Sequence, residues 1–587
     1  MSTAKFAVLL EFRYLATLAV MAAAATGCRQ PSSDPDEFTL KDVISLEDSS
    51  VSDSADAPSD SFAEPEEFNE IDPGIGTYVN PILHADYSDP DAVRVGDDYW
   101  MISSSFSQVP GLPILHSRDL VNWSLVSHAL PRLVPEESFA LPQHGKGVWA
   151  PSIRYHDGLF WIYYPDPESG LYVMTTSDPL GPWSGPVLVK AGKGLIDPCP
   201  FWDDDGQVYL VHGWAKSFAG ISNVLTLLRL NADGMGVAED LGVVIDGEAF
   251  PGTSTLEGPK IYRRNGWTYI FAPAGGVTYG WQMVFRARDI RGPYQARTVM
   301  DQGTTIINGP HQGALVDTPA GESWFLHFQD MGVYGRIVHL QPVVWKDDWP
   351  VIGEDPDGDG KGQPVLGYRK LGLPQQPRVE PPTGDLFDAP ELGLQWQWQA
   401  NPDRAWYSLA AIPGSMRLFA QPEPNPGNLY DAPYLMLQKF PAQSFSVSTT
   451  LDGTGLAEGE SAGLIVFGFD YMWLGLKRID GAARLVLADG RGGLLGMPQG
   501  ELVVEIPEGA RERPISLRVT VENGGLCRFD YSLDGSSFIA ADTGDFQASM
   551  GRWIGAKVGL FAAASAAGGL GNADFAEVIV KILGSTD

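Results

Sequence analysis

The amino-acid sequence predicts an all-β protein, a five-bladed β-propeller followed by a β-sandwich, and three observations support this fold class. The 587 residues include Gly 67 and Pro 45, a proportion typical of a turn-rich β protein rather than a helical one. A unit that opens on a proline and continues into an aromatic strand recurs five times after residue 80. In the last two hundred residues, apolar runs alternate with Asp-Gly turns, which indicates a second β region.

The first residues of the chain are predicted to be a targeting segment. Residues 14–27, YLATLAVMAAAATG, form a short apolar stretch that ends in small residues immediately before Cys28. This is the shape of a signal peptide and is short for a membrane span. Because Ala25-Thr26-Gly27-Cys28 resembles a bacterial lipobox, we expect residues 1–28 to be a lipoprotein signal peptide with lipid attached to Cys28. An ordinary signal peptide with an incidental cysteine is the alternative.

Residues 29–76 are predicted to be a disordered acidic tether. Residues 32–72 contain 14 Asp and Glu against the single Lys41, and such a segment cannot bury enough apolar surface to offset its ordering entropy. With the anchor, this predicts an exported cell-envelope lipoprotein, in the outer membrane or at the cell surface, that contacts the membrane only through its lipid. The net charge of −33 argues against a nucleic-acid partner, because phosphate recognition needs a basic face.

Residues 77–365 are predicted to form the propeller. Five prolines, spaced 47 to 61 residues apart, each precede an apolar strand, a tight turn and a second, aromatic strand; they are Pro90, Pro151, Pro198, Pro259 and Pro310. Asp-Gly and Asn-Gly between such runs are hairpin signals. Five units of about 50 residues, all strand, fit a five-bladed propeller better than a pair of β-sandwiches with coincidental prolines.

A proline-rich linker is expected at 366–384 and the β-sandwich at 385–587, where runs such as SFSVSTTLD (444–452) and WIGAKVGLFA (553–562) alternate or are continuously apolar. Cys199 falls in the predicted propeller and Cys527 in the predicted sandwich. We therefore expect both to be free, buried thiols.

The repeat also predicts where chemistry occurs. If each proline opens the innermost strand of a blade, the residues beside it converge near the central axis; they are Asp89, Trp149, Asp197, Glu257 and His311. Three carboxylates in one funnel would repel one another unless function maintained them, although a ring of capping carboxylates is the alternative. Convergent carboxylates suit hydrolysis of an acetal, in which one ionised group activates water and a second, protonated group assists the leaving oxygen.

At these residues the chain resembles glycoside hydrolase family 43, the β-xylosidase and α-L-arabinofuranosidase family. The matching motifs, in order, are NPILHADYSDPDAVRVGDDYWM (80–101), KGVWAPSIRYHDGLFWIYY (146–164), LIDPCPFWDDDGQVYLVHG (195–213), LEGPKIYRRNGWTYIFAPAGG (256–276), INGPHQGALVDT (307–318) and GRIVHLQPVVW (335–345). The C-terminal region, from FDAPELGLQWQWQANPD (387–403) onward, is similar to the concanavalin-like, jelly-roll sandwich that often follows such propellers.

The resemblance implies roles for individual residues. Asp89 would be the general base, Glu257 the general acid and Asp197 the group that modulates the pKa of the acid. Trp149 would be a pocket wall and Arg336 the pocket arginine. Independently of the resemblance, the position of Phe106 in SSSFSQVPG predicts packing against the sugar ring.

The implied activity is that of an exo-acting, inverting glycoside hydrolase that removes xylose, arabinose or both from xylo- or arabino-oligosaccharides of the plant cell wall. A propeller fructosidase and a catalytically dead surface sugar-binding protein are the alternatives. No cofactor is required, but a structural calcium ion near the propeller axis is possible, with His311 facing it through water. A hydrogen-bonded core histidine is an equal alternative for that residue. The run DPDGDGKG (355–362) resembles a calcium loop but lacks the final glutamate, which favours a solvated acidic turn.

Overall fold

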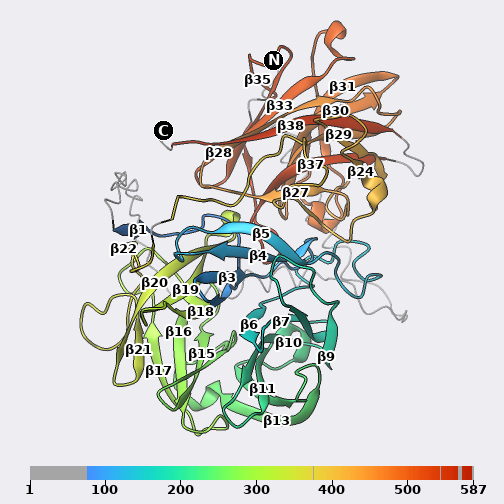
Figure 1. The fold of residues 1–587 in the computed structure, drawn as a ribbon. Helices are drawn as coiled ribbons and strands as arrows, with labels where there is room; N and C mark the ends of the chain where they lie inside the picture. The colour runs from blue at the N-terminus through green and yellow to red at the C-terminus, as the bar shows by residue number, and fades with distance from the viewer. Residues whose placement is uncertain (1–75, 375, 543, 566–570, 585–587) are drawn as a thin grey trace, which may run out of the picture. The chain divides into compact units, whose positions relative to one another are not determined.

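A computed structural model describes residues 76–374, 376–542, 544–565 and 571–584 (Figure 1). The predicted signal peptide with Cys28, and all of the predicted tether except Gly76, lie outside these residues. Within the described ranges no helix combines the length and the apolar character that a membrane-spanning segment requires.

The N-terminal half of the described chain is a five-bladed β-propeller, as predicted. Each blade is a four-stranded antiparallel sheet whose strands follow one another in sequence order. The blades consist of β2 (Asp91–Val95), β3 (Asp98–Ile102), β4 (Gly111–Ser117) and β5 (Ser124–Leu130); β6 (Ser152–His156), β7 (Leu159–Asp166), β8 (Gly170–Thr176) and β9 (Val187–Ala191); β10 (Leu195–Trp202), β11 (Val208–Trp214), β12 (Val224–Leu230) and β13 (Val237–Asp246); β14 (Lys260–Arg264), β15 (Trp267–Ala274), β16 (Trp281–Ala287) and β17 (Gln295–Met300); and β18 (His311–Asp317), β19 (Ser323–Asp330), β20 (Arg336–Lys346) and β21 (Trp349–Ile352).

The hairpins between the first two strands of a blade confirm the turn signals in the sequence. In the second and fourth blades, Asp157-Gly158 and Asn265-Gly266 both have positive φ at the two central positions, from +49° to +77°. Two-residue hairpins need this conformation to match the right-handed twist of the strands, and Gly, Asn and Asp adopt it most readily. These turns therefore fix the register of the innermost strand against its neighbour.

The two ends of the propeller chain are paired with each other. β1 (Thr77–Val79) lies antiparallel to β22 (Gly367–Arg369), with Thr77 opposite Arg369. The propeller also contains short helical turns, which are α3 (Lys216–Ala219), η1 (Gly247–Ala249) and η2 (Gly332–Tyr334).

The C-terminal half is a β-sandwich of two eight-stranded sheets. One sheet contains β23 (Gln397–Trp398), β26 (Gln421–Pro422), β27 (Met436–Lys439), β29 (Glu460–Phe467), β30 (Tyr471–Ile479), β31 (Ala482–Asp489), β32 (Gly500–Val504) and β37 (Lys557–Ala564). The other contains β24 (Tyr407–Ser408), β25 (Met416–Phe419), β28 (Phe445–Asp452), β33 (Ile515–Glu522), β34 (Leu526–Ser532), β35 (Ile539–Ala540), β36 (Phe546–Gln547) and β38 (Asn572–Ile582). The single-turn helices are η3 (Arg404–Trp406), η4 (Gly493–Leu495) and η5 (Glu508–Ala510).

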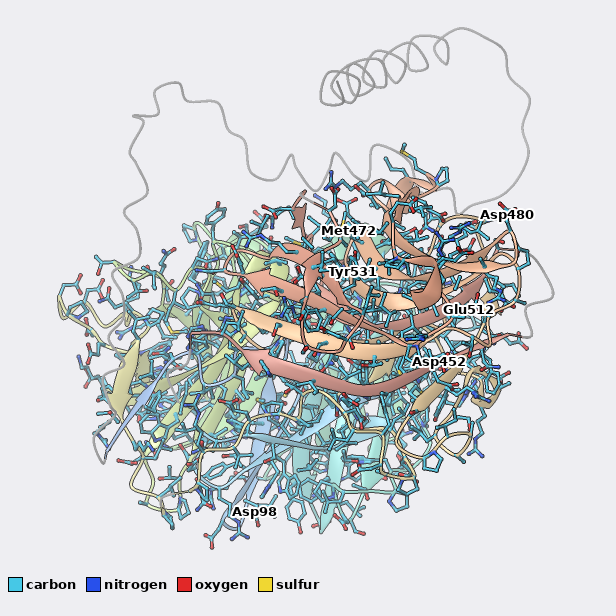
Figure 2. The ribbon with its side chains drawn as sticks, turned by 90° about the horizontal axis from the view of Figure 1, so that it is seen from above. Asp98, Asp452, Met472, Asp480, Glu512 and Tyr531 are labelled. Atoms are coloured by element: carbon cyan, nitrogen blue, oxygen red, sulfur yellow. The ribbon has the colours of Figure 1, made fainter. Side chains whose placement is uncertain are left out.

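The inner faces of these two sheets form one apolar core. Alternate residues of β28 and β33 are buried, as expected for strands with one face on a core. Figure 2 labels Met472 on one sheet and Tyr531 on the other, and both side chains belong to that core. The predicted free thiols are confirmed: Cys199 and Cys527 are both buried and unpaired.

Propeller and sandwich share packing and hydrogen bonds. Tyr334 and Ile337 of the fifth blade are part of the sandwich core. The backbone of Val109 pairs with that of Trp398, and the ammonium of Lys557 donates to Gln108 Oε1 at 2.8 Å. Both residues of the latter pair are buried, so this polar contact between the halves is shielded from bulk solvent.

Candidate active site

The predicted site residues meet where the innermost strands of the blades begin. Asp89 directly precedes the proline before β2, and Glu257 precedes the Gly-Pro pair before β14. Asp197 lies within β10, where the pairing with β11 shifts register. Asp89 and Asp197 share a left-handed backbone, with φ of +55° and +56°. Non-glycine residues rarely adopt that region, and such strain is typical of functional sites.

Asp89 is held by an ion pair and two hydroxyls. Arg336 Nη1 lies 3.0 and 3.2 Å from the two carboxylate oxygens of Asp89, and both residues are buried. Ser104 Oγ donates to Oδ2 at 2.5 Å, and Ser88 Oγ donates to the same atom at 3.1 Å. Four contacts of this kind fix the orientation of the carboxylate and stabilise its negative charge.

Asp197 is buried next to the strand that carries Glu257. Its Oδ2 accepts the backbone N–H of Gly258 at 2.7 Å. Burial and the negative charge of Asp89 raise the pKa of Asp197, whereas the Gly258 N–H, Lys260 and Arg336 oppose that rise. Asp197 thus interacts with Asp89 through charge and with the backbone of Gly258, the residue after Glu257, through a hydrogen bond.

Glu257 keeps part of its surface exposed, in contrast to the two aspartates. Burial of its carboxyl group, followed by the charges of Asp197 and Asp89, raises the pKa of Glu257 to about 8. The negative charge of Asp197 favours protonation of Glu257, and the N–H of Gly258 stabilises the ionised form of Asp197. The site therefore combines one carboxylate fixed by arginine with one carboxylic acid.

Aromatic rings enclose these groups. Trp149, which is partly exposed, has its ring edge-to-face with Phe106, Phe218 and Trp553, at centroid distances of 6.4, 5.9 and 6.0 Å. Phe106 is itself only 4% exposed, so it supports Trp149 from behind. The structure thus brings the predicted pair Phe106 and Trp149 together and adds two further rings.

Sequence reasoning missed Trp553, because this residue comes from the sandwich and not from the propeller. Its ring centroid lies 5.9 Å from Arg336 Cζ, so one side chain contacts both the pocket tryptophan and the pocket arginine. Nothing in the local sequence of Trp553 distinguishes it from a core residue of the adjacent strand β37.

Asp86 was also missed, and it explains how Trp553 reaches the site. Asp86 Oδ1 accepts the backbone N–H of Arg336 at 3.0 Å, and Oδ2 accepts that of Gly555 at 2.9 Å. One buried carboxylate therefore positions the backbone of Arg336 and the sandwich loop that carries Trp553.

His311 begins β18 and is buried against Phe328, with the ring centroids 5.1 Å apart. Neither ring nitrogen has a hydrogen-bond partner in the described structure. Burial, followed by the charges of Arg336 and His327, lowers the pKa of His311 to about 3, so the ring is neutral. Within the described residues, the one close cluster of metal-ligating side chains is Asp355, Asp357 and Asp359, in the acidic turn away from this histidine.

Comparison with known proteins gives the site a context. The family model described as Glycosyl hydrolases family 43 matches residues 78–350, and that described as Beta xylosidase C-terminal Concanavalin A-like domain matches residues 384–581. A protein named putative beta-xylosidase from Xylanibacter ruminicola is 44% identical over 60% of this chain and 64% of its own length, just under two thirds.

Two further similar proteins are matched over a larger share of their own length. A protein named non-reducing end alpha-L-arabinofuranosidase from Bacteroides ovatus is 32% identical over 66% of this chain and 73% of its own length. The crystal structure of a xylan beta-1,4-xylosidase from Bacillus halodurans superimposes with a TM-score of 0.75 and 26% identity, covering 86% of this chain and 99% of that one.

Proposed function

The chain belongs to glycosyl hydrolase family 43, and from that premise we propose that it is an exo-acting, inverting glycosidase that removes xylose from the non-reducing end of xylo-oligosaccharides. The observation that supports this most directly is the pairing of a protonated Glu257 with an arginine-bound Asp89 in one aromatic-walled pocket. Names of similar proteins support the choice of pentose.

The reaction needs one proton to leave water and one to reach the departing sugar. Asp89 accepts the proton from a water molecule whose oxygen attacks the anomeric carbon. As that bond forms, the glycosidic C–O bond breaks, and Glu257 donates its proton to the leaving oxygen. Attack from the face opposite the leaving group inverts the anomeric configuration. Asp197 maintains the raised pKa that keeps Glu257 protonated beforehand.

The aromatic walls and Arg336 support exo action. The rings of Phe218 and Trp553 pack against Trp149, and apolar ring faces suit the C–H face of a pyranose. Arg336 contacts Trp553 as well as Asp89, so it can bind a substrate hydroxyl while it orients the base.

Hydrolysis of 4-nitrophenyl β-D-xylopyranoside by the protein, with NMR detection of the first anomer released, tests this proposal. We expect α-xylose as the first product. Initial release of β-xylose would contradict inversion, and absence of turnover would favour a sugar-binding protein. Arabinose is the second candidate, because one similar protein is named an α-L-arabinofuranosidase. Faster cleavage of 4-nitrophenyl α-L-arabinofuranoside would select it.

We also propose that the enzyme is exported and anchored to the cell envelope through lipid on Cys28, and that the acidic tether holds it away from the surface. The lipobox-like ending at Cys28 and the charge of the segment that follows support this.

A structural calcium ion at the propeller axis is a further proposal. Neither ring nitrogen of His311 has a hydrogen-bond partner among the described residues, so the ring can bond to a water molecule of a hydrated calcium ion. His311 would hold the ion through that water. The ion would supply positive charge that stabilises the blade starts. We expect calcium to raise the unfolding temperature of the wild type and not that of His311→Ala; equal shifts in both would contradict the site.

A further inference from the structure

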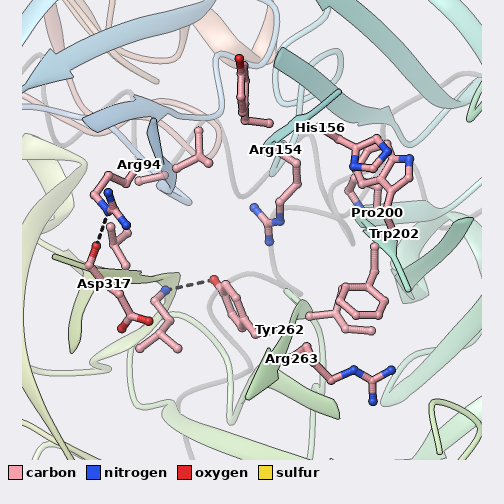
Figure 3. Close-up of a pocket in the computed structure, with 15 residues that line it drawn as sticks. Arg94, Arg154, His156, Pro200, Trp202, Tyr262, Arg263 and Asp317 are labelled. Carbon is pink, nitrogen blue, oxygen red and sulfur yellow. Dashed lines mark hydrogen bonds between the residues drawn. The ribbon is translucent and has the colours of Figure 1, made fainter. Parts of the chain in front are cut away.

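A second cavity lies at the opposite ends of the innermost strands. It has a volume of about 370 Å³ and is lined by residues of all five blades, from β2, β6, β10, β14 and β18 (Figure 3). The catalytic carboxylates stand where these strands begin, whereas the cavity is formed where they end, at Trp202 and Asp317 among others. Pockets that bind small molecules have volumes of about 300–1,000 Å³.

Buried ion pairs separate this cavity from the catalytic site. Asp91 is fully buried, and its Oδ2 accepts from Arg154 Nη1 at 2.6 Å and from the backbone N–H of Ile153 at 2.9 Å. The ammonium of Lys260 lies 3.9 Å from the same oxygen and donates to the carbonyl of Pro151 at 2.8 Å. These buried groups lie between the two ends of the innermost strands, so the cavity is a separate, solvent-facing site.

Arg154 lines the cavity with a guanidinium edge whose Nε is not engaged and whose Nη2 carries a second N–H besides the one given to Cys199. Its Nη1 donates to Asp91 and to the carbonyl of Ile153, and its Nη2 donates to Cys199 Sγ at 2.9 Å. Its Nε has no hydrogen-bond partner among the residues that the structure describes, and Figure 3 shows the guanidinium pointing into the middle of the cavity. The Nε–Nη2 edge of a guanidinium matches the two oxygens of a carboxylate.

The remaining walls suit an organic anion. Trp202 stacks on His156, with ring centroids 4.6 Å apart, and Tyr262 lies beneath the guanidinium of Arg154 at 5.4 Å. Arg94 lies across the cavity, bonded to the backbone carbonyl of Asp317 at 2.7 Å. The lining includes three arginines, Arg94, Arg154 and Arg263, and one carboxylate, Asp317. Arg154 is paired with Asp91, and Arg263 is paired with Asp203. Arg94 donates to backbone carbonyls instead, so it contributes the positive charge that these carboxylates do not offset.

We propose that this cavity binds a small organic carboxylate of the size of one sugar acid. The carboxylate forms two hydrogen bonds with the Nε–Nη2 edge of Arg154, and the carbon skeleton packs against Trp202 and Tyr262. Arg94 supplies long-range attraction. The site is distinct from the catalytic pocket and takes a different class of ligand, since a neutral sugar has no carboxylate to form the charge-assisted, two-point pair with the guanidinium.

Calorimetric titration of the full-length protein with D-glucuronate tests the proposal. Arg154→Lys keeps the charge beside Asp91 but removes the forked donor edge, and Trp202→Ala removes the packing wall. We expect each to weaken glucuronate binding about tenfold or more, the equivalent of one lost charge-assisted hydrogen bond or one aromatic contact. The matched control is Arg229→Lys, because Arg229 pairs with Glu239 on outer strands of a blade, away from the cavity.

D-glucose and inorganic phosphate serve as control ligands in the same titration. Glucose lacks the carboxylate, so equal binding of glucose and glucuronate would overturn the proposal. Phosphate lacks the carbon skeleton, so binding as tight as that of glucuronate and insensitive to Trp202→Ala would overturn recognition of an organic ligand. If Arg154→Lys fails to fold, by near-UV circular dichroism, Trp202→Ala decides: weakened glucuronate binding by this variant supports the proposal, whereas unchanged binding by the variant, or no binding by the wild type, refutes it.

Discussion

Asp89 and Glu257 are carboxyl groups of one pocket, yet their surroundings give them opposite tasks. Asp89 receives an arginine and two serine hydroxyls, which stabilise negative charge. Glu257 receives no such donors in the described structure and instead experiences the charges of Asp89 and Asp197. Environment rather than residue type therefore underlies the proposed assignment of Asp89 as base and Glu257 as acid.

Separate loss of the two groups should have different consequences. Glu257→Gln removes the proton donor, so we expect a loss of about 10²–10⁴-fold in kcat/KM on xylobiose but a much smaller loss on 4-nitrophenyl xyloside, whose leaving group barely needs protonation. Asp89→Asn removes activation of water, so losses should be heavy on both. The measurement is the ratio of kcat/KM on xylobiose to that on 4-nitrophenyl xyloside for each variant. Equal ratios for the two variants would contradict the assignment of Glu257 as acid and Asp89 as base.

The pH dependence follows from the raised pKa of Glu257. Because the acid must be protonated, activity is present below its pKa and is lost as the pH rises through about 8. Asp197→Asn removes a negative charge that raises this pKa, so the alkaline limb of the rate profile should move to lower pH by about one unit, or about 1.4 kcal/mol. A limb that stays in place would show that Asp197 does not act on Glu257.

At the scale of elements, the pocket depends on a loop that precedes β37 of the sandwich. Trp553 adopts a φ of +65°, and Asp86 fixes the loop through Gly555. Gly145 allows the close approach, since a Cβ there would lie 2.3 Å from Arg552 Cγ. The sandwich loop thus packs closely against the segment between β5 and β6 that contains Gly145.

Trp553→Ala should therefore impair substrate binding. A ring that contacts both Trp149 and Arg336 contributes to the ground state and the transition state alike, so we expect KM for xylobiose to rise about tenfold while kcat changes less. The control is Trp406→Ala, a sandwich tryptophan that packs on Trp398 and Tyr434 and should lower stability without raising KM. An unchanged KM for Trp553→Ala would remove this residue from the pocket.

For the molecule as a whole, attachment to the envelope is the open prediction. Cys28→Ser removes the atom that would carry lipid, so the variant should appear in the soluble fraction or remain unprocessed, whereas the wild type stays with membranes. Cys199→Ser, which alters a buried thiol, is the matched control and should leave the distribution unchanged. Continued membrane association of Cys28→Ser would refute the lipoprotein.

Much of this architecture could be predicted because its signals are local. Proline, turn and aromatic strand recur within each blade, and the residue beside each proline inherits a place near the axis, as Asp89 and Glu257 do. Trp553 and Asp86 could not be found in this way, because their roles depend on contacts between segments hundreds of residues apart. Cys28 lies outside the described residues, so its role remains a prediction.

The hydrogen bonds of Asp86 have a consequence for how the enzyme fails on heating. A single carboxylate holds Arg336 from the propeller and Gly555 from the sandwich, with the buried Lys557 nearby. Parting of the two halves would withdraw Trp553 and loosen Arg336. Among the buried residues that the structure describes, it would take only Tyr334 and Ile337 of the fifth blade out of the sandwich core. Loss of activity on heating would then precede unfolding of the two domains. Stronger contacts between propeller and sandwich, rather than repacking of either core, would extend the time for which the enzyme stays active at high temperature.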